Sequence, residues 1–142
     1  QQDLRQIGLN VSVRGIADNS LIALRGSLTG HQLSTAYWGI DFPDAFDIYT
    51  GQMSCVANAP GGYAGPHYCD PTADRLVSTA ESLPLGTERD LLLRQAQLRL
   101  LRAAPSVPLV YLKNVEMVSP QVGGFYYQPT FALQFENYWL QQ

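Results

Sequence analysis

The residues best suited to chemistry lie in one stretch, residues 36–44, whose sequence is AYWGIDFPD. Tyr37 and Trp38 come directly before Gly39, and Asp41 follows two residues after the glycine. Aromatic rings exclude water and attract cations, and a carboxylate beside them acts in a lower effective dielectric. Glycine lets the backbone approach another group closely because it has no Cβ. This combination is typical of a pocket for an amino group or another cationic group.

The same stretch also has a purely structural interpretation. In that interpretation Tyr37 and Trp38 are core residues, and Asp41 caps a helix that begins near Pro43. Buried aromatic residues and aspartates at helix starts are both common, so the motif by itself leaves the two interpretations open.

An enzyme is the third alternative, because Asp41, Asp44 and Asp47 are closely spaced carboxylates and His31 and His67 are the two histidines. A hydrolase would use Asp41 and Asp44 as an acid–base pair. The sequence has no serine in a nucleophile elbow, no glycine-rich loop after the first strand and no histidine-rich ligand set. We therefore predict no enzyme activity, no cofactor and no metal.

Cys55 and Cys69 are the two cysteines, and a loop rich in glycine, proline and asparagine separates them. Long loops inside compact domains are uncommon unless they are functional or tied down. A disulfide between the two cysteines is the favoured interpretation, and it implies an oxidising compartment. The alternatives are two free thiols in a reducing cytosol or, more weakly, a metal site with His67.

The overall composition fits a single globular domain that can bury a core. The chain has 142 residues, of which 46% are hydrophobic and 15% charged, and its net charge is −3. A nucleic-acid-binding surface would need a basic stripe, and the sequence contains none. No apolar run approaches the roughly 20 residues of a membrane-spanning helix. The first eight residues look like the end of a helix stopped by Gly8, so we expect the chain to be part of a longer protein.

Helical and extended segments alternate along the chain, which predicts an α/β fold with helices packed on a mixed sheet. The strand–helix–strand order at the start favours two parallel strands, with a ligand site beyond their carboxyl ends, where Gly39 and Asp41 lie. Asp70 and Pro71 form a strong helix start, and Thr87 with Asp90 predicts a capping box. We expect strands at residues 9–13, 33–38, 107–112, 115–118 and 125–127, and helices at residues 20–27, 70–82 and 87–104. Residues 43–53 fit either a helix or an irregular turn.

Several of these segments, in this order, resemble one known family. The chain is similar to the C-terminal part of solute-binding proteins of ABC importers, in the dipeptide- and oligopeptide-binding class. Each matching segment is weak alone, but together they cover nearly the whole chain. The matching segments are residues 4–11, 37–44, 68–76, 88–89, 95–97, 104–109 and 118–124.

The resemblance implies a role for each residue of the first motif. In peptide-binding members the aspartate of this segment pairs with the α-ammonium group of the ligand, and the tryptophan lines the pocket. Carried over to this chain, Asp41 anchors the amine, Trp38 forms a wall, and Tyr37 and Gly39 shape the edge of the pocket. A disulfide in dipeptide-type relatives also matches the cysteine pair.

The resemblance further implies how the chain is organised and where it acts. Residues 1–113 would be part of the second, ligand-binding lobe, and residues 114–142 would be the crossover and the tail that returns to the first lobe. The whole protein would bind peptides or similar small solutes between two lobes and deliver them to a membrane permease. It would be periplasmic or extracellular, lipid-anchored or secreted. A solute-sensing module of a regulatory protein is the alternative use of such a fold.

The tail carries too much apolar surface to remain in water alone. Its large apolar residues would stabilise any partner that covers them, since burying each contributes about 1.5–3 kcal/mol. We therefore expect the chain by itself to associate with a second copy through residues 115–140. The residues concerned are Val118, Val122, Phe125, Tyr126, Phe131, Phe135, Tyr138 and Trp139.

Overall fold

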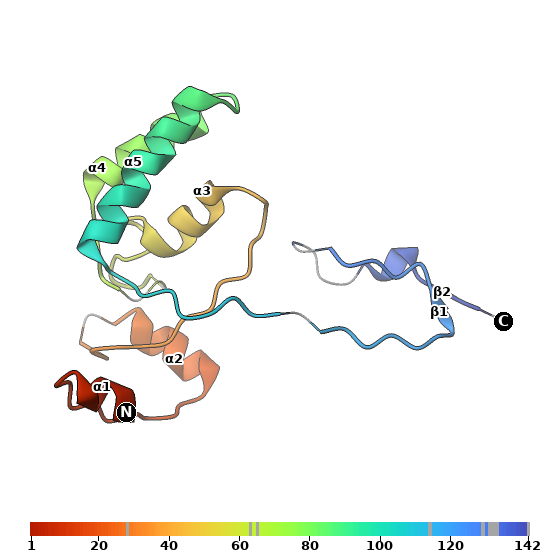
Figure 1. The fold of residues 1–142 in the computed structure, drawn as a ribbon, viewed down its shortest axis with the longest axis horizontal. Coiled ribbons are helices and arrows are strands. Elements are labelled where there is room, and N and C mark those ends of the chain that lie inside the picture. The colour runs from red at the N-terminus through yellow and green to blue at the C-terminus, as the bar shows by residue number, and fades with distance from the viewer. Residues whose placement is uncertain are drawn as a thin grey trace.

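The computed structural model describes residues 1–27, 29–62, 64, 66–113, 115–128, 130 and 134–141. Helices dominate this part of the chain, and a short antiparallel pair of strands lies near its end (Figure 1). Three residues that bear on the predictions lie outside the described residues. They are Leu28, next to the helix predicted at 20–27, Asn114 at the predicted lobe boundary, and Phe131 in the tail.

The elements follow one another along the chain, with η1 a π-helix and η2 a 3₁₀ helix. The helices are α1 (Gln2–Gln6), α2 (Asp18–Arg25), α3 (Ala45–Ile48), η1 (Tyr49–Met53), α4 (Pro71–Glu81), α5 (Thr87–Ala103) and η2 (Phe135–Asn137), and the strands are β1 (Val122–Gly123) and β2 (Trp139–Leu140). The strands pair in antiparallel register, with Val122 opposite Leu140 and Gly123 opposite Trp139.

Local signals account for the ends of several helices. The Gly8 N–H bonds the carbonyl of Arg5 and the Leu9 N–H bonds that of Leu4, with Gly8 at φ +86°, which is a Schellman stop for α1. The Asp70 carboxylate accepts the N–H groups of Thr72 (2.9 Å) and Ala73 (3.2 Å) and so caps α4. Both predicted helix ends are confirmed.

The capping box predicted for α5 is wrong. Gly86, not Thr87, is the residue before the helix, and no side chain caps it. Helix α2 begins at Asp18, two residues before the predicted start, and its N-cap Ala17 makes no side-chain hydrogen bond to it. Helix boundaries depend on how each segment packs as well as on its local sequence, and this explains shifts of one or two residues.

The core lies where α4 and α5 pack side by side against α3 and η1 (Figure 1). Tyr49, Ala73, Val77 and Ala96 are buried together at its centre. The alanines of this group are small, so they let the helix backbones approach closely. Larger side chains close the margin of the core, namely Phe46, Met53, Leu76, Leu93 and Leu100.

The structure does not form the predicted mixed sheet, although the chain does combine helices with a two-stranded antiparallel sheet. The structure forms no strand at residues 9–13, 33–38, 107–112, 115–118 or 125–127. Within the described residues these segments find no neighbouring strand, and a strand is stable only when its backbone groups pair. Leu33 is 72% exposed and Tyr37 is 68% exposed, so the segment expected to be a buried strand runs over the surface.

The C-terminal residues form a separate small cluster. Figure 1 shows β1, β2 and η2 at the end of a long extended segment, away from helices α1 to α5. Phe125 and Phe135 each contact the ring of Tyr138, with ring centroids 5.9 and 5.6 Å apart. The indole of Trp139 lies directly on Gly123 and Gly124, where any Cβ would collide with it. No helix in the described part of the chain has both the length and the apolar composition to cross a membrane.

Candidate functional site

Asp44 is the N-cap residue of helix α3, and two groups hold its carboxylate in place. Its carboxylate accepts the N–H of Phe46 at 2.9 Å and forms an ion pair with Arg89 of α5 at 2.6 Å. The hydrogen bonds from Arg89 and from the Phe46 N–H hold the pKa of Asp44 below its ordinary value. Asp44 therefore caps α3 and ties it to α5.

These contacts exclude the helix cap of the structural interpretation. Asp41 does not cap the helix, because Asp44 occupies that position. Arg89 is buried against Asp44. An ion-paired carboxylate that also caps a helix is poorly placed to exchange protons with a substrate, which weakens the interpretation of Asp41 and Asp44 as an acid–base pair.

Asp47 of α3 connects the two ends of the Trp38–Asp41 motif. Its Oδ2 accepts the indole N–H of Trp38 at 3.0 Å and the backbone N–H of Asp41 at 3.2 Å. The residue is only 3% exposed. Sequence reasoning noted Asp47 as one of three close carboxylates but gave it no structural role. The available signal was an aspartate between Phe46 and Ile48 in a short apolar helix.

Trp38 is also held by direct contact with the π-helix η1. A Cβ built on Gly51 would lie 2.3 Å from Cζ2 of the indole, so only glycine lets the ring approach this closely. The hydrogen bond to Asp47 and the contact with Gly51 together fix the ring against α3 and η1.

Asp41, Tyr37 and Gly39 lie on the surface beside this anchored ring. Asp41 and Gly39 are exposed, and the Tyr37 hydroxyl reaches over Gly39, 3.6 Å from where a Cβ would stand. The Asp41 carboxylate forms no hydrogen bond or ion pair with the described residues, so it is available to an external cation. Three of the four predicted residues are thus exposed, and Trp38 between them is half-buried.

The two best-defined hollows of the described residues lie elsewhere. One, of about 380 Å³, lies between α2 and the glycines at 61–62, and the other, of about 250 Å³, lies between η1 and α4. Neither is lined by Trp38 or Asp41.

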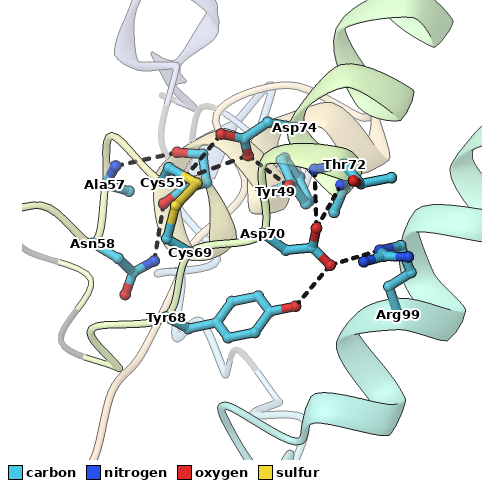
Figure 2. Close-up of a disulfide and its surroundings, with 12 residues drawn as sticks. Tyr49, Cys55, Ala57, Asn58, Tyr68, Cys69, Asp70, Thr72, Asp74 and Arg99 are labelled. Carbon is cyan, nitrogen blue, oxygen red and sulfur yellow. Dashed lines mark hydrogen bonds and ion pairs between the residues drawn. A yellow bond between two sulfur atoms is a disulfide. The ribbon is translucent and has the colours of Figure 1, made fainter.

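The cysteine pair forms the predicted disulfide, which joins the loop after η1 to the residue before the α4 cap (Figure 2). The Cα atoms of Cys55 and Cys69 are 4.3 Å apart. Within the loop between them, Ala57, Asn58 and Ala64 are buried. The Nδ2 of Asn58 donates to the carbonyls of Gln52 and Ser54, both at 3.0 Å, which draws the loop inward.

Asp74 of α4 connects the disulfide to the core (Figure 2). Its Oδ2 accepts the N–H of Cys55 at 3.2 Å, and its Oδ1 accepts the Tyr49 hydroxyl at 2.6 Å. Burial raises the pKa of Tyr49, and the hydrogen bond to Asp74 raises it further. The tyrosine is therefore a neutral donor that ties η1 to α4.

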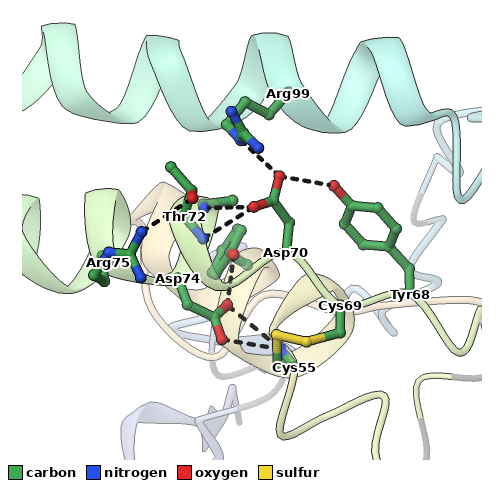
Figure 3. A network of polar contacts seen from close by, with 10 residues as sticks. Cys55, Tyr68, Cys69, Asp70, Thr72, Asp74, Arg75 and Arg99 are labelled. Atoms are coloured by element: carbon green, nitrogen blue, oxygen red, sulfur yellow. Dashed lines mark hydrogen bonds and ion pairs between the residues drawn. A yellow bond between two sulfur atoms is a disulfide. The ribbon is translucent and has the colours of Figure 1, made fainter.

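Asp70 is the centre of a second polar network between α4 and α5 (Figure 3). Besides capping α4, its carboxylate bonds Arg99 of α5 at 2.6 Å and accepts the Tyr68 hydroxyl at 3.3 Å. The hydrogen bond from Arg99 is the main cause that lowers the pKa of Asp70 to about 2. Asp70 therefore acts as a structural anion that holds the two helices together.

Arg25 and His31 each contact a residue of the disulfide loop. The Arg25 guanidinium is buried and donates to Gln52 at 3.3 Å and to the carbonyl of Ala64. The rings of His31 and His67 are 5.7 Å apart. Because the cysteines are bonded to each other, they cannot join His67 as thiolate ligands. No cluster of three potential metal ligands occurs in the described residues.

Comparisons with known proteins identify the kind of protein this chain resembles. Di/tripeptide-binding protein 4 and the probable di/tripeptide-binding protein 5, both of Pseudomonas aeruginosa strain UCBPP-PA14, are each 29% identical to it over 129 residues. These matches cover 91% of this chain and 24% of each relative. The chain is related to peptide-binding proteins. The resemblance predicted from the sequence motifs is confirmed.

A third relative is also named as a peptide-binding protein. The periplasmic oligopeptide-binding protein OppA of Salmonella typhimurium strain LT2 is 24% identical over 121 residues, which cover 85% of this chain and 21% of OppA. The chain therefore spans about a quarter of the length of the curated relatives it matches. All three relatives are named as binding proteins and none as an enzyme. No family model and no solved structure matches the chain significantly.

Proposed function

We propose that this chain supplies one side of a binding site for peptides or similar small solutes that carry a free amino group. The observation that carries the proposal is the match to di/tripeptide-binding proteins over 91% of the chain. In this proposal Asp41 pairs with the ligand amine and Trp38 forms the wall of the site. Tyr37 and Gly39 shape its edge.

The local geometry supports these roles. Asp41 is exposed, and its carboxylate is unpaired among the described residues, while its backbone is tied to the buried Asp47. An exposed carboxylate next to a fixed indole ring offers a cation both an opposite charge and an aromatic face. The exposure of Tyr37, Gly39 and Asp41 fits a ligand that is enclosed only when a second lobe closes over it.

The arrangement of the chain is consistent with a division between two lobes. Residues 1–113 would belong to the ligand-binding lobe, and residues 114–142 would cross to the first lobe. The extended segment and the separate C-terminal cluster in Figure 1 support this division. The exposed apolar side chains of the extended segment, Val107, Leu109, Val110 and Tyr111 among them, would then be covered by parts of the protein outside this chain.

In the complete protein, the site would serve an ABC importer by delivering solutes to its membrane permease. A periplasmic or extracellular location, through secretion or a lipid anchor, would fit the disulfide, because such bonds persist in oxidising compartments. The word periplasmic in the name of OppA supports the same location.

Calorimetry with two probes tests the proposal. The complete protein that contains this chain should bind trialanine, and Asp41→Asn should weaken this binding by about 2–5 kcal/mol, since one partner of a desolvated charge pair is lost. N-acetyl-trialanine, which lacks the ammonium group, should bind weakly to both forms. The chain by itself should bind trialanine very weakly, because it supplies only one side of the site. Equal affinity of the unmodified protein for the two probes would remove the proposed role of Asp41.

A further inference from the structure

The unusual feature of the site is a carboxylate buried without a cation. Asp47 is 3% exposed, yet the ion pairs found among the described residues are Arg89–Asp44 and Arg99–Asp70. Burying a carboxylate is costly unless hydrogen bonds or an opposite charge compensate for it. Here the compensation comes from two N–H donors on one oxygen, those of Trp38 and Asp41.

The two donors belong to the two ends of the proposed ligand-binding motif. The Trp38 indole is otherwise fixed by its contact with Gly51, which restrains the plane of the ring. The hydrogen bond to Asp47 restrains its rotation, since Nε1 must point at Oδ2. The bond to the Asp41 N–H fixes the backbone from which the exposed carboxylate projects.

We propose that Asp47 is the positioning residue of this site, which holds the Trp38 ring and the Asp41 backbone at a set distance for a ligand amine. This inference rests on the proposed function. Asp47 does not touch the ligand and acts only through the other two residues. A preorganised wall and anchor bind more tightly because the ligand does not have to order them.

Two substitutions at Asp47 separate hydrogen bonding from charge. Asp47→Leu has a similar volume but no acceptor, so both donors lose their partner. Asp47→Asn removes the charge but keeps an amide oxygen, and one oxygen suffices because Oδ2 alone accepts both bonds. Asp44→Leu is the matched control, since it removes a carboxylate of the same helix that contacts Arg89 and not Trp38.

The first measurement follows Trp38 without any ligand. All variants carry Trp139→Phe, so that Trp38 is the single tryptophan. Asp47→Leu should shift the emission of Trp38 and weaken its near-ultraviolet circular dichroism, and Asp47→Asn should restore most of both signals. Asp44→Leu should lower the melting temperature and leave the Trp38 spectrum in place.

The second measurement is trialanine affinity by calorimetry on the complete protein, because this chain supplies only one side of the proposed site. Asp47→Leu should bind at least about tenfold more weakly, as expected when hydrogen bonds to a charged group are lost, and Asp47→Asn should recover most of that affinity. If Asp47→Leu does not fold, Trp38→Phe replaces it. This variant keeps an aromatic ring but lacks the N–H, and it should also weaken binding.

The outcomes separate this inference from the function on which it rests. An unchanged Trp38 spectrum in Asp47→Leu, or an equal change in Asp44→Leu, overturns the positioning role. Unchanged trialanine affinity in Asp47→Leu, or in Trp38→Phe where that variant is used, overturns it as well. If the unmodified protein binds no trialanine while the spectra change as expected, the proposed function fails and the anchoring of Trp38 by Asp47 stands.

Discussion

Aspartates that lie close together in the sequence have different roles, which their neighbours determine. Asp44 has an arginine and a helix N-terminus, Asp47 has two N–H donors, and Asp41 has neither and faces outward. Each role follows from what compensates the negative charge. A carboxylate without internal compensation is the one that remains available for an external cation.

At the residue scale, Asp70 should make stability depend on acid pH. Its pKa is lowered from 3.8 to about 2 in the folded protein, so its contribution is fully present above pH 3.8 and is lost as the pH falls toward 2. Asp70→Asn keeps an acceptor for the α4 cap but has no charge to titrate. Urea unfolding at several pH values should show a smaller loss of stability below pH 4 in this variant.

Arg99→Met provides the second arm of that experiment. It removes the guanidinium that is the main cause of the low pKa and leaves the Asp70 cap in place. Its stability should therefore also fall less on acidification than that of the unmodified protein. Parallel stability curves for all three proteins between pH 4 and pH 2 would contradict the role assigned to the Arg99–Asp70 pair.

At the scale of elements, small side chains and one covalent bond bring the helices together. Ala73 and Ala80 of α4 are 0% exposed and Ala96 of α5 is 2% exposed, so the two helices meet through residues with little volume. The disulfide and Asp74 then attach η1 and the loop after it to the start of α4. The surface that carries Trp38 is thereby supported by the most extensively packed helices of the chain.

The disulfide should contribute measurably to this support. Cys55 and Cys69 are 14 residues apart in sequence, and closing a loop of about this length constrains the unfolded chain by about 3 kcal/mol. Intact-mass measurement should find no alkylated cysteine before reduction and two after it. Replacing both cysteines by serine should lower the free energy of unfolding in urea and make it insensitive to reductant. Two alkylated thiols in the unreduced protein would contradict the bond.

At the scale of the whole molecule, the C-terminal cluster and the extended segment before it expose much apolar surface. Phe135, Trp139 and Leu140 are 69%, 59% and 75% exposed even though the cluster has its own ring contacts and strand pair. The extended segment before it exposes Val115 and Met117 as well. Such surface tends to be covered by another molecule when the same chain offers nothing to cover it.

We therefore predict that the chain by itself self-associates through residues 115–140. Light scattering at micromolar concentration should give a mass above that of one chain, and removing the residues after Lys113 should return it to that of a monomer. The truncated chain keeps all the helices of the main core, from α1 to α5, and so serves as its own folding control. A monomeric mass for both forms would contradict the prediction.

Sequence by itself determined the features whose causes lie within a few residues. The stop of α1 at Gly8 and the start of α4 at Asp70 and Pro71 depend on backbone groups at most five positions away. The disulfide followed because only two cysteines were available to close the loop. The resemblance to peptide-binding proteins also came from motifs in linear order.

Tertiary structure decided which residues are buried and what they contact. Arg89 lies 45 residues from Asp44 in sequence, and no local pattern could reveal that they pair. Asp47 gained its role only when Trp38 folded over Gly51. The predicted strands did not form, again because of distant contacts. The local sequence favours extended structure, but a strand is stable only beside another strand, and the described residues supply none to those segments.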